Sequence, residues 1–385
     1  MIRSGISSII FLNGHLPIMR EQDFLQVHDG ARAYSERIPM AKNRLTRREF
    51  GKMLIAGSAT VVLPAVTTRH AYAADTVRGG LQIGAMGALR TSLPAASSKH
   101  DITFEAKDFR DSTSVLLAIE QNELEIGNTT TQHLIRAISE NIPVRWVCGW
   151  GGGYNVLVAR KGLNIKPGDA VALKALAAAR KQSGKPLVIG TPTGSLQHAK
   201  LATYLKSAGV DPDKDVQIAN IPFPNHPRAL EAGEVDMAMT LSAFGAIAID
   251  KGDAALFLHL FGGSFGKQEV GLIVSEKLIR DKPALVQRIV NAHVDAMKTF
   301  MGQPDKQIEL ERKYSRLPDS VIQMQERQFL QYNFRTNIGD IRTMASELKQ
   351  LGWVKDDLSG KVSSFIDLSF AAKASGLTAD ELSRW

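Results

Sequence analysis

AIEQNELEIGNT, at residues 118–129, returns as ALEAGEVDMAMT at residues 229–240. The matching residues keep a constant offset of 111 positions along both copies. Each copy has the pattern of a helix end, a tight turn at Asn122 or Gly233, a buried strand, and a loop that begins at the strand's carboxyl end. This internal repeat predicts two lobes of similar fold.

The sequence around the repeat alternates between short apolar runs and helical patterns from Val77 onward. LQIGAMGA at residues 81–88 and LVIGTPTG at residues 187–194 each predict a buried strand followed by a glycine-containing loop. SLQHAKLATYLKSAGV, at residues 195–210, has helical periodicity and a stop signal at Gly209. Alternation of this kind predicts an α/β fold.

Small, hydroxyl-bearing and amide-bearing residues follow the predicted strands in both halves. Ligands of open α/β sheets bind beyond the carboxyl ends of the strands, where helix N-termini present unpaired N–H groups. Two facing lobes therefore predict a cleft for a small polar or anionic ligand. The candidate ligand-binding residues are Gly84, Ala85, Met86, Arg110, Asp111, Ser112, Thr113, Thr129, Thr130 and Thr131, then Thr191, Thr193, Gly194, Ser195, Pro222, Phe223, Asn225, Thr240, Ser242 and Phe244. Helix capping without any ligand is the alternative for each Ser and Thr.

Four segments, in this order, resemble the solute-binding proteins of ATP-driven nitrate, sulfonate and taurine importers. They are LQIGAMGAL, LLAIEQNELEIGNTTTQHLIRAISENIPV, LVIGTPTGSLQHAKLATYLKSAGV and PRALEAGEVDMAMTLSAF. The resemblance runs from about Val77 to about Phe300. It implies an ABC-importer subunit that captures a small anionic or polar solute of the sulfonate, nitrate or organic-acid type. Its partners would be the permease and ATPase subunits. A sensor subunit that reports to a membrane receptor is the alternative.

The resemblance also implies a two-lobed periplasmic binding protein fold of type II, with the ligand cleft between the lobes. The chain would cross between lobes at YNVLVARK (residues 154–161) and at EVGLIVSEK (residues 269–277). Residues 77–160 and 270–385 would form one lobe and residues 161–269 the other. The lobes would close on the ligand by hinge motion.

Two residues near the predicted cleft have candidate roles of their own. Trp150, in WGGGY just before the first crossing, is a candidate for stacking on a ligand, with a buried Trp as the alternative. Arg110 is a candidate for pairing with an anionic head group, because a guanidinium donates two parallel hydrogen bonds. Taurine-binding relatives often have Trp and Pro where this chain has LSAFG, so the substrate cannot be inferred from the resemblance.

LTRREFGKMLIAGSATVVLPAV, at residues 45–66, has the order of an export signal: a basic region, an apolar run and the small-residue site that ends at Ala73. Arg47, Arg48 and Phe50 match the twin-arginine motif. Residues 40–73 are thus predicted to be a signal peptide for the twin-arginine translocase, cleaved after Ala73 on export to the periplasm. Residues 1–39 are predicted to be a non-native extension, since Met40 lies just before the basic region. An uncleaved membrane anchor is the alternative.

Removing residues 1–73 leaves 37 basic and 34 acidic residues, a net charge of +3. So small an excess predicts no nucleic-acid partner. The single cysteine, Cys148, allows no internal disulfide and no cysteine-rich iron motif, which argues against a synthase of the thiamin-pyrimidine type. We expect neither a metal nor a cofactor, and we expect the mature chain to act as a monomer.

A hydrolase is the remaining enzymatic alternative. GGSFG, at residues 262–266, fits the G-x-S-x-G pattern of a nucleophile elbow. The sequence that follows, KQEVGLIVSEK, favours a strand over the helix that such an elbow requires. A tight turn is therefore the preferred interpretation, and we expect no catalytic residues.

Overall fold

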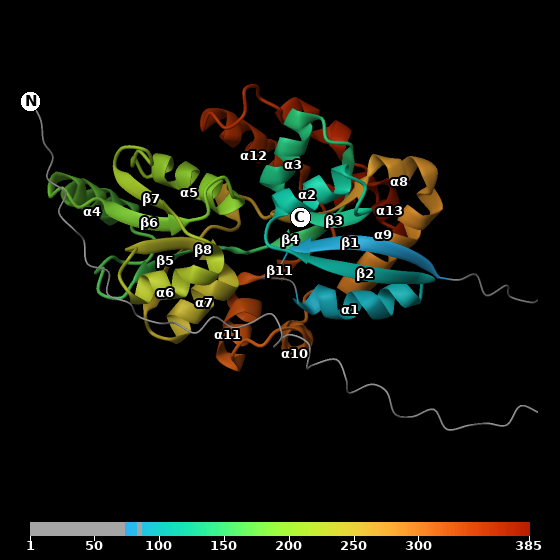
Figure 1. Cartoon of the computed structure of the whole chain (residues 1–385), viewed down its shortest axis with the longest axis horizontal. Helices are drawn as coiled ribbons and strands as arrows, with labels where there is room; N and C mark the ends of the chain where they lie inside the picture. Colours follow the sequence, from blue (N-terminus) through green and yellow to red (C-terminus); the bar gives the residue numbers. More distant parts are fainter. Residues whose placement is uncertain (1–73, 83–86) are drawn as a thin grey trace, which may run out of the picture. The chain divides into compact units, whose positions relative to one another are not determined.

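The computed structural model describes residues 74–82 and 87–385, whose strands form two sheets (Figure 1). The first sheet contains β1 (Asp75–Gln82), β2 (Ile102–Phe109), β3 (Ile126–Thr130), β4 (Val144–Gly152), β10 (Val270–Ser275) and β11 (Gln331–Tyr332). The second contains β5 (Asn155–Arg160), β6 (Leu187–Thr191), β7 (Val216–Asn220), β8 (Met237–Leu241) and β9 (Ala254–His259). Their strand orders are β11-β4-β10-β3-β1-β2 and β7-β6-β8-β5-β9.

Apart from β11, the two sheets are built in the same way. In the first sheet β1 pairs in parallel with β2 and β3, and β10 lies antiparallel between β3 and β4. In the second sheet β6 pairs in parallel with β7 and β8, and β5 lies antiparallel between β8 and β9. The repeated stretch supplies β3 in one sheet and β8 in the other. The prediction of two similar α/β lobes is confirmed.

Helices cover both faces of each sheet (Figure 1). The first lobe has α1 (Gly87–Ser98), α2 (Ser112–Glu120), α3 (Thr131–Glu140), α8 (Glu276–Asp281), α9 (Pro283–Lys298), α12 (Ile338–Gln350), η5 (Ser359–Phe365), α13 (Ser369–Ser375) and α14 (Ala379–Leu382). The second has α4 (Ala170–Gln182), α5 (Leu196–Ser207), η2 (Phe223–Asn225), α6 (His226–Glu231) and α7 (Ser242–Asp250).

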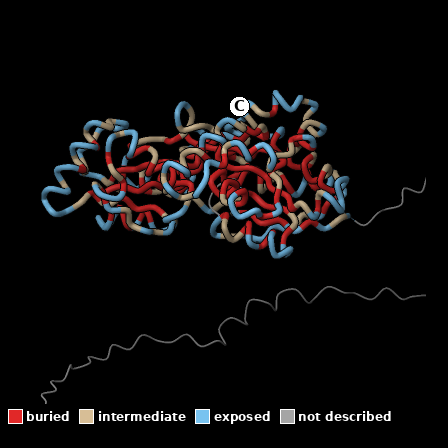
Figure 2. Tube along the Cα trace, turned by 90° about the horizontal axis from the view of Figure 1, so that it is seen from above, coloured by how far each residue is buried: buried red, intermediate tan, exposed pale blue. Residues whose placement is uncertain are grey.

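Strand β5 illustrates how each sheet is buried on both faces. Val156 and Val158 pack with α6 and α7, whereas Leu157 and Ala159 pack with α4 and α5. Successive side chains of a strand point to opposite faces, so an unbroken apolar run is what a doubly covered sheet requires. Figure 2 shows this buried backbone running through both lobes beneath exposed loops.

The chain passes between the sheets twice, and each passage comes just before a strand. It leaves the first sheet after β4, at Gly153–Tyr154, and returns after β9 through η3 (Gly263–Phe265) to β10. The predicted first boundary, after residue 160, is therefore too late, because β5 already belongs to the second sheet. Each lobe thus receives its antiparallel strand immediately after the chain enters it.

Glycine is required at the first passage. Gly153 has φ +90°, and a Cβ there would lie 2.0 Å from the carbonyl oxygen of Phe329. Any larger residue would be strained by its backbone conformation and would also collide with that carbonyl.

The C-terminal helices do not all stay on the first lobe. After α10 (Pro304–Tyr314), which packs on α1, the chain continues into α11 (Asp319–Met324), which packs on α7 of the second lobe. The π-helix η4 (Gln325–Phe329) then leads back to β11. The prediction that residues 270–385 all belong to one lobe needs correction, since Val321 and Phe329 are buried in the second-lobe core.

The predicted extension at residues 1–39 and the predicted signal at residues 40–73, with Arg47, Arg48, Phe50 and the cleavage site at Ala73, lie outside the described residues. Among the residues that are described, none of the helices is both long and apolar enough to span a bilayer.

Candidate functional site

A cleft of about 700 Å³ lies between the two lobes, lined from both sides by the segments that follow parallel strands. Its volume falls within the range of about 300–1,000 Å³ that is usual for small-molecule sites. Ten predicted residues line it: Arg110, Asp111, Ser112, Thr130, Thr193, Gly194, Ser195, Phe223, Asn225 and Phe244. Thr113 and Pro222, from the wider predicted set, line it as well.

The first-lobe wall begins at the end of β2. Asp111 caps α2, because its Oδ1 accepts a hydrogen bond of 2.8 Å from the N–H of Ser114. The hydroxyl of Ser112 donates to Oε1 of Gln82 over 2.9 Å. Arg110 is exposed and makes no hydrogen bond or ion pair with any residue that the structure describes. Arg110 is thus the one Lys or Arg of the described lining, and its guanidinium is available to a ligand.

His133 joins two threonines of this wall. Its Nδ1 lies 2.7 Å from Oγ1 of Thr130, and its Nε2 lies 3.0 Å from Oγ1 of Thr113. Only 7% of its surface is exposed, and burial lowers its pKa to about 4, although Asp111 raises the pKa and Arg136 lowers it slightly further. At neutral pH the ring is therefore uncharged, and both of its nitrogens are already hydrogen-bonded.

The second-lobe wall combines uncharged polar side chains, backbone groups and apolar side chains. Ser195 caps α5 by accepting from the N–H of His198 over 3.1 Å, and Gly194 has φ +77° in the preceding loop. The N–H of Thr193 donates to Oδ1 of Asn220 over 3.0 Å. Phe223 is half-buried and packs against a core cluster that belongs mainly to the first lobe. Capping and cleft lining are therefore not exclusive, because Thr130, Asp111 and Ser195 do both.

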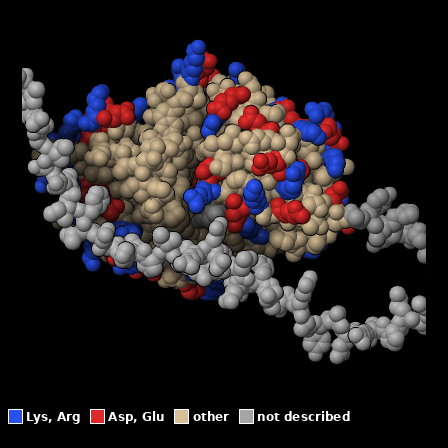
Figure 3. Space-filling view, viewed as in Figure 1, with Lys and Arg blue, Asp and Glu red and all other residues tan. Residues whose placement is uncertain are grey.

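On the face drawn in Figure 3, acidic and basic side chains gather over the first lobe, while a broad uncharged area covers part of the second. The cleft follows the same division, since its Arg110 and Asp111 both come from the first lobe.

Four predicted residues do not line this cleft. Thr129, Thr191, Thr240 and Ser242 are fully buried at or just after the ends of β3, β6 and β8, and their hydroxyls have no hydrogen-bond partner in the described part of the chain. Thr131, from the wider predicted set, is buried in the same manner. Gly84, Ala85 and Met86 lie outside the described residues.

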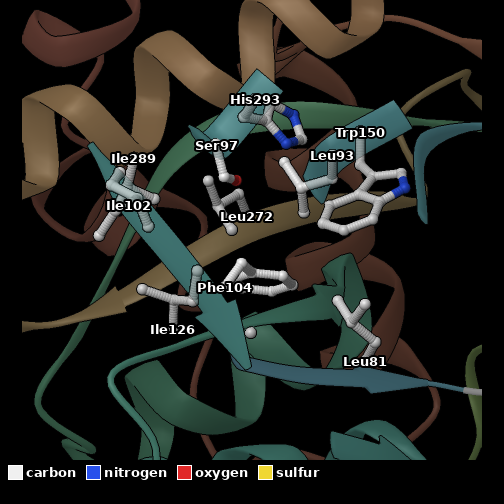
Figure 4. Close-up of a pocket in the computed structure, with 11 residues that line it drawn as sticks. Leu81, Leu93, Ser97, Ile102, Phe104, Ile126, Trp150, Leu272, Ile289 and His293 are labelled. Atoms are coloured by element: carbon white, nitrogen blue, oxygen red, sulfur yellow. The ribbon is translucent and has the colours of Figure 1, made fainter. Parts of the chain in front are cut away.

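The prediction that Trp150 stacks on a cleft ligand needs correction. Trp150 is 1% exposed and lies in the first-lobe core, with its ring centroid 5.1 Å from that of His293. Figure 4 shows both rings beside Leu93 and Phe104, around a cavity of only about 20 Å³. The residue sits in β4, and its side chain points to the face that α1 and α9 cover.

The joint between the lobes is held by a buried ion pair. Lys200 of α5 donates over 2.9 Å to Oε1 of Glu269, which precedes β10, and the two side chains are 4% and 0% exposed. The other oxygen of Glu269 accepts from the N–H of Tyr154 over 2.8 Å. One carboxylate therefore connects both passages of the chain to a helix of the second lobe.

The same two passages also cap helices. The N–H of Thr131, at the start of α3, donates to the carbonyl of Glu269 over 3.0 Å. The N–H of Ser242, at the start of α7 and 111 positions later, donates to the carbonyl of Tyr154 over 2.9 Å. Any movement of the joint is thereby coupled to the helices that flank the cleft.

Sequence reasoning missed several cleft residues. Gln82, His133, Pro192, Leu196, Gln197, Asn220, Pro224 and Leu241 line the cleft and were not in the predicted set. His133 had a signal, since it stands three residues after the predicted cap Thr130, where a first-turn side chain turns back toward the cap. The others lie within two positions of residues that were predicted.

Comparison with known proteins gives the family and the fold. Residues 95–310 match the NMT1-like family. The taurine-binding periplasmic protein of Escherichia coli (strain K12) is 23% identical over 218 residues, which are 56% of this chain and 63% of that protein's length.

Solved structures share the fold at low identity. The nitrate-binding protein NrtA from Synechocystis PCC 6803 has a TM-score of 0.65 at 13% identity, covering 80% of this chain and 90% of that one. The alkanesulfonate-binding protein SsuA from Xanthomonas axonopodis pv. citri, bound to MOPS, has a TM-score of 0.61 at 15% identity, with coverages of 76% and 98%. These likenesses confirm the two-lobed periplasmic binding protein fold.

The fold alone does not decide between binding and catalysis. The desulfurization enzyme DszB also has it, with a TM-score of 0.58 at 15% identity over 78% of this chain and 99% of that one. The family match covers more than half of the sequence and both lobes. This chain belongs to the NMT1-like family.

Proposed function

We propose that this protein is the solute-binding subunit of an ABC importer for a small anionic or polar solute of the sulfonate, nitrate or organic-acid type. The observation that carries the proposal is the cleft of about 700 Å³ between two repeated lobes, with Arg110 available in its wall. A solute that contacts loops of both lobes would hold the lobes together and so stabilise the closed form. The permease and ATPase subunits are the partners that would recognise this form.

The cleft residues favour binding over catalysis. Thr113 and His133 have the spacing of a hydroxyl and its general base, at 3.0 Å. The other ring nitrogen faces Thr130 and not a carboxylate, and a pKa of about 4 makes the imidazole a weak base at neutral pH. Arg110 adds a permanent charge that suits an anion.

Neither the GGSFG segment nor Cys148 has the structure of a nucleophile site. The GGSFG segment forms the turn η3 and is followed by β10, a strand, so the prediction of a tight turn is confirmed. Burial raises the pKa of the Cys148 thiol well above its ordinary value, and its Sγ donates to the carbonyl of Phe334 over 3.3 Å. A buried, protonated thiol is a poor nucleophile.

The proposal extends to the cellular setting. We propose that residues 40–73 direct the folded chain to the twin-arginine translocase, that cleavage follows Ala73, and that the mature protein works in the periplasm as a monomer. Sequencing the N-terminus of the protein recovered from cells tests the cleavage site.

A ligand screen tests the function. Nitrate, methanesulfonate, benzenesulfonate, benzoate and N-heterocycles would be added singly while the melting temperature is recorded, because a solute that binds only the folded state raises it. We expect a rise with at least one oxyanion and a calorimetric stoichiometry of one per chain. Thr193→Ala should weaken that binding by about 1 kcal/mol, the value of one hydrogen bond. No rise with any member of the panel would contradict the proposal.

A further inference from the structure

The hydrogen-bond directions around His133 determine what the first-lobe wall offers a solute. Neutral imidazole has one N–H donor and one bare nitrogen, so one threonine must donate to the ring and the other must accept from it. Thr130 Oγ1 already accepts from the N–H of His133 as the cap of α3. The Thr130 hydroxyl therefore forms its best second hydrogen bond by donating its proton to Nδ1 of His133, 2.7 Å away.

This arrangement leaves the ring proton on Nε2. The Nε2–H then donates to Oγ1 of Thr113 over 3.0 Å, which occupies an acceptor site of that oxygen and frees its own proton. Thr130 is 8% exposed, whereas Thr113 is half-buried and faces the cleft. A hydroxyl with an unused donor is better placed at the wetter position, because an unpaired buried donor costs free energy.

The opposite tautomer is less favourable for the same reason. With the proton on Nδ1, Thr130 would accept from the ring and from the backbone, and its own proton would have to find an acceptor at a position that is only 8% exposed. Thr113 would then donate to Nε2 and present only lone pairs to the cleft.

We propose that His133 is a positioning residue that turns the Thr113 hydroxyl proton toward the cleft, so that Thr113 and Arg110 together bind the oxyanion end of the solute. This inference rests on the proposed function and deepens it. Thr113 is the second residue of α2, two positions after the cap Asp111, and Arg110 immediately precedes that cap. The start of this helix thus supplies two donors to the lining of one cleft.

The surroundings of the ring keep it neutral over the working range. Asp111 on the neighbouring segment favours the charged ring, and Arg136 on the same helix, paired with Glu140 at 2.9 Å, disfavours it. Burial outweighs both and places the pKa at about 4. Oxyanion affinity should therefore be constant between pH 5.5 and pH 8.

The tautomer is measured without any solute. Nitrogen-15 NMR of the full mature chain at pH 7, with the signals assigned through His133→Asn, should show His133 neutral and protonated on Nε2. A proton on Nδ1, or a charged ring at pH 7, would overturn the inference. His100→Gln, a change at a half-buried histidine paired with Asp295, provides the control spectrum.

Variants test the consequence for binding, with methanesulfonate and benzenesulfonate as probes. Thr113→Val removes the hydroxyl at constant shape and should weaken binding about tenfold, whereas Thr113→Ser should stay within about twofold of the parent. His133→Gln keeps an amide donor near Nε2 and should retain affinity better than His133→Asn, which places its amide near Nδ1. Equal losses in His133→Gln and His133→Asn at unchanged melting temperature would overturn the positioning role.

The two proposals fail in different ways. If no oxyanion binds, the proposed function fails and the NMR tautomer still decides how Thr113 is oriented. If an oxyanion binds and its affinity falls severalfold as the pH rises through about 6.5, the ordinary pKa of histidine, then a charged His133 binds the anion directly and the positioning role is wrong.

Discussion

The two walls of the cleft come from equivalent positions of a repeated fold, yet they differ in chemistry. At the offset of 111 residues, Ser112 corresponds to Phe223, Thr130 to Leu241 and His133 to Phe244. The first lobe presents hydroxyls, an imidazole and both charged side chains of the described lining, while the second presents phenylalanine, leucine and proline side chains beside uncharged polar ones such as Asn220 and Asn225. The backbone of the wall was repeated, whereas its side chains were not: the charged groups lie in the first lobe and the two phenylalanines, Phe223 and Phe244, lie in the second.

Acid should destabilise the protein through both lobes. Burial lowers the pKa of His198 and His259 in the second lobe, and it lowers the pKa of three further histidines, His133, His293 and His226, to about 4. These rings bind protons only when the chain unfolds, so their contribution to stability is complete above about pH 6.5 and is lost as the pH falls toward 4. Lowering the pH from neutral to 5 should remove about 2 kcal/mol of the free energy of unfolding for each of these three histidines.

Urea unfolding of single variants at pH 7 and pH 5 measures this difference. His293→Gln should make the fall in unfolding free energy between pH 7 and pH 5 smaller than that of the parent by about 2 kcal/mol. A fall as large as that of the parent would show that His293 is not buried as a neutral ring.

The two walls depend on the buried ion pair between Lys200 and Glu269 at the joint of the lobes. Glu269→Gln would leave Lys200 charged, buried and without its carboxylate, and should cost about 3–5 kcal/mol of unfolding free energy. Asp281→Asn breaks the exposed pair with Lys277 and should cost less than about 1 kcal/mol. Similar losses in both variants, measured by urea unfolding, would contradict the role given to the joint.

Arg110→Ala should remove the charge of the polar wall. We expect oxyanion affinity, measured by calorimetry with benzenesulfonate, to fall by about 1.5–3 kcal/mol, the value of hydrogen bonds to a charged group. Lys107→Ala, three positions earlier in β2 and outside the cleft lining, is the matched control and should leave affinity unchanged. Equal effects would indicate a general response to net charge.

Phe244→Ala should act on the apolar wall and discriminate between solutes. Benzenesulfonate should lose about 1–2 kcal/mol of binding free energy, because its ring would lose apolar contact, while methanesulfonate should lose much less. Leu117→Ala, an exposed change on α2, is the control. A loss of the same size for both solutes would mean that Phe244 supports the loop and does not contact the body of the solute.

The repeat made the two lobes predictable because matching turns and strands must fold alike wherever they occur. The same reasoning did not locate the passages between the lobes. An antiparallel strand such as β5 has the same apolar pattern in either sheet, so its sequence does not say which sheet it joins. Nor did the sequence of residues 319–324 indicate that α11 packs on the second lobe.

The candidate site was predictable to the extent that it follows strand ends. Loops after β2, β6 and β7 supply most of the predicted residues that do line the cleft. Trp150 and the four buried hydroxyls were misplaced because strand position alone does not tell which way a side chain faces. His133 was missed because its position three residues after Thr130 indicates only a contact with that cap, whereas its contact with Thr113, from another helix, appears only in the structure.

A crystal structure of the mature protein with the oxyanion that most raises its melting temperature tests the account most directly. We expect one solute between the lobes, with its charged oxygens at Arg110 and Thr113 and its body against Phe223 and Phe244. A solute bound outside this cleft, or one with its charged end against the second lobe, would contradict the account.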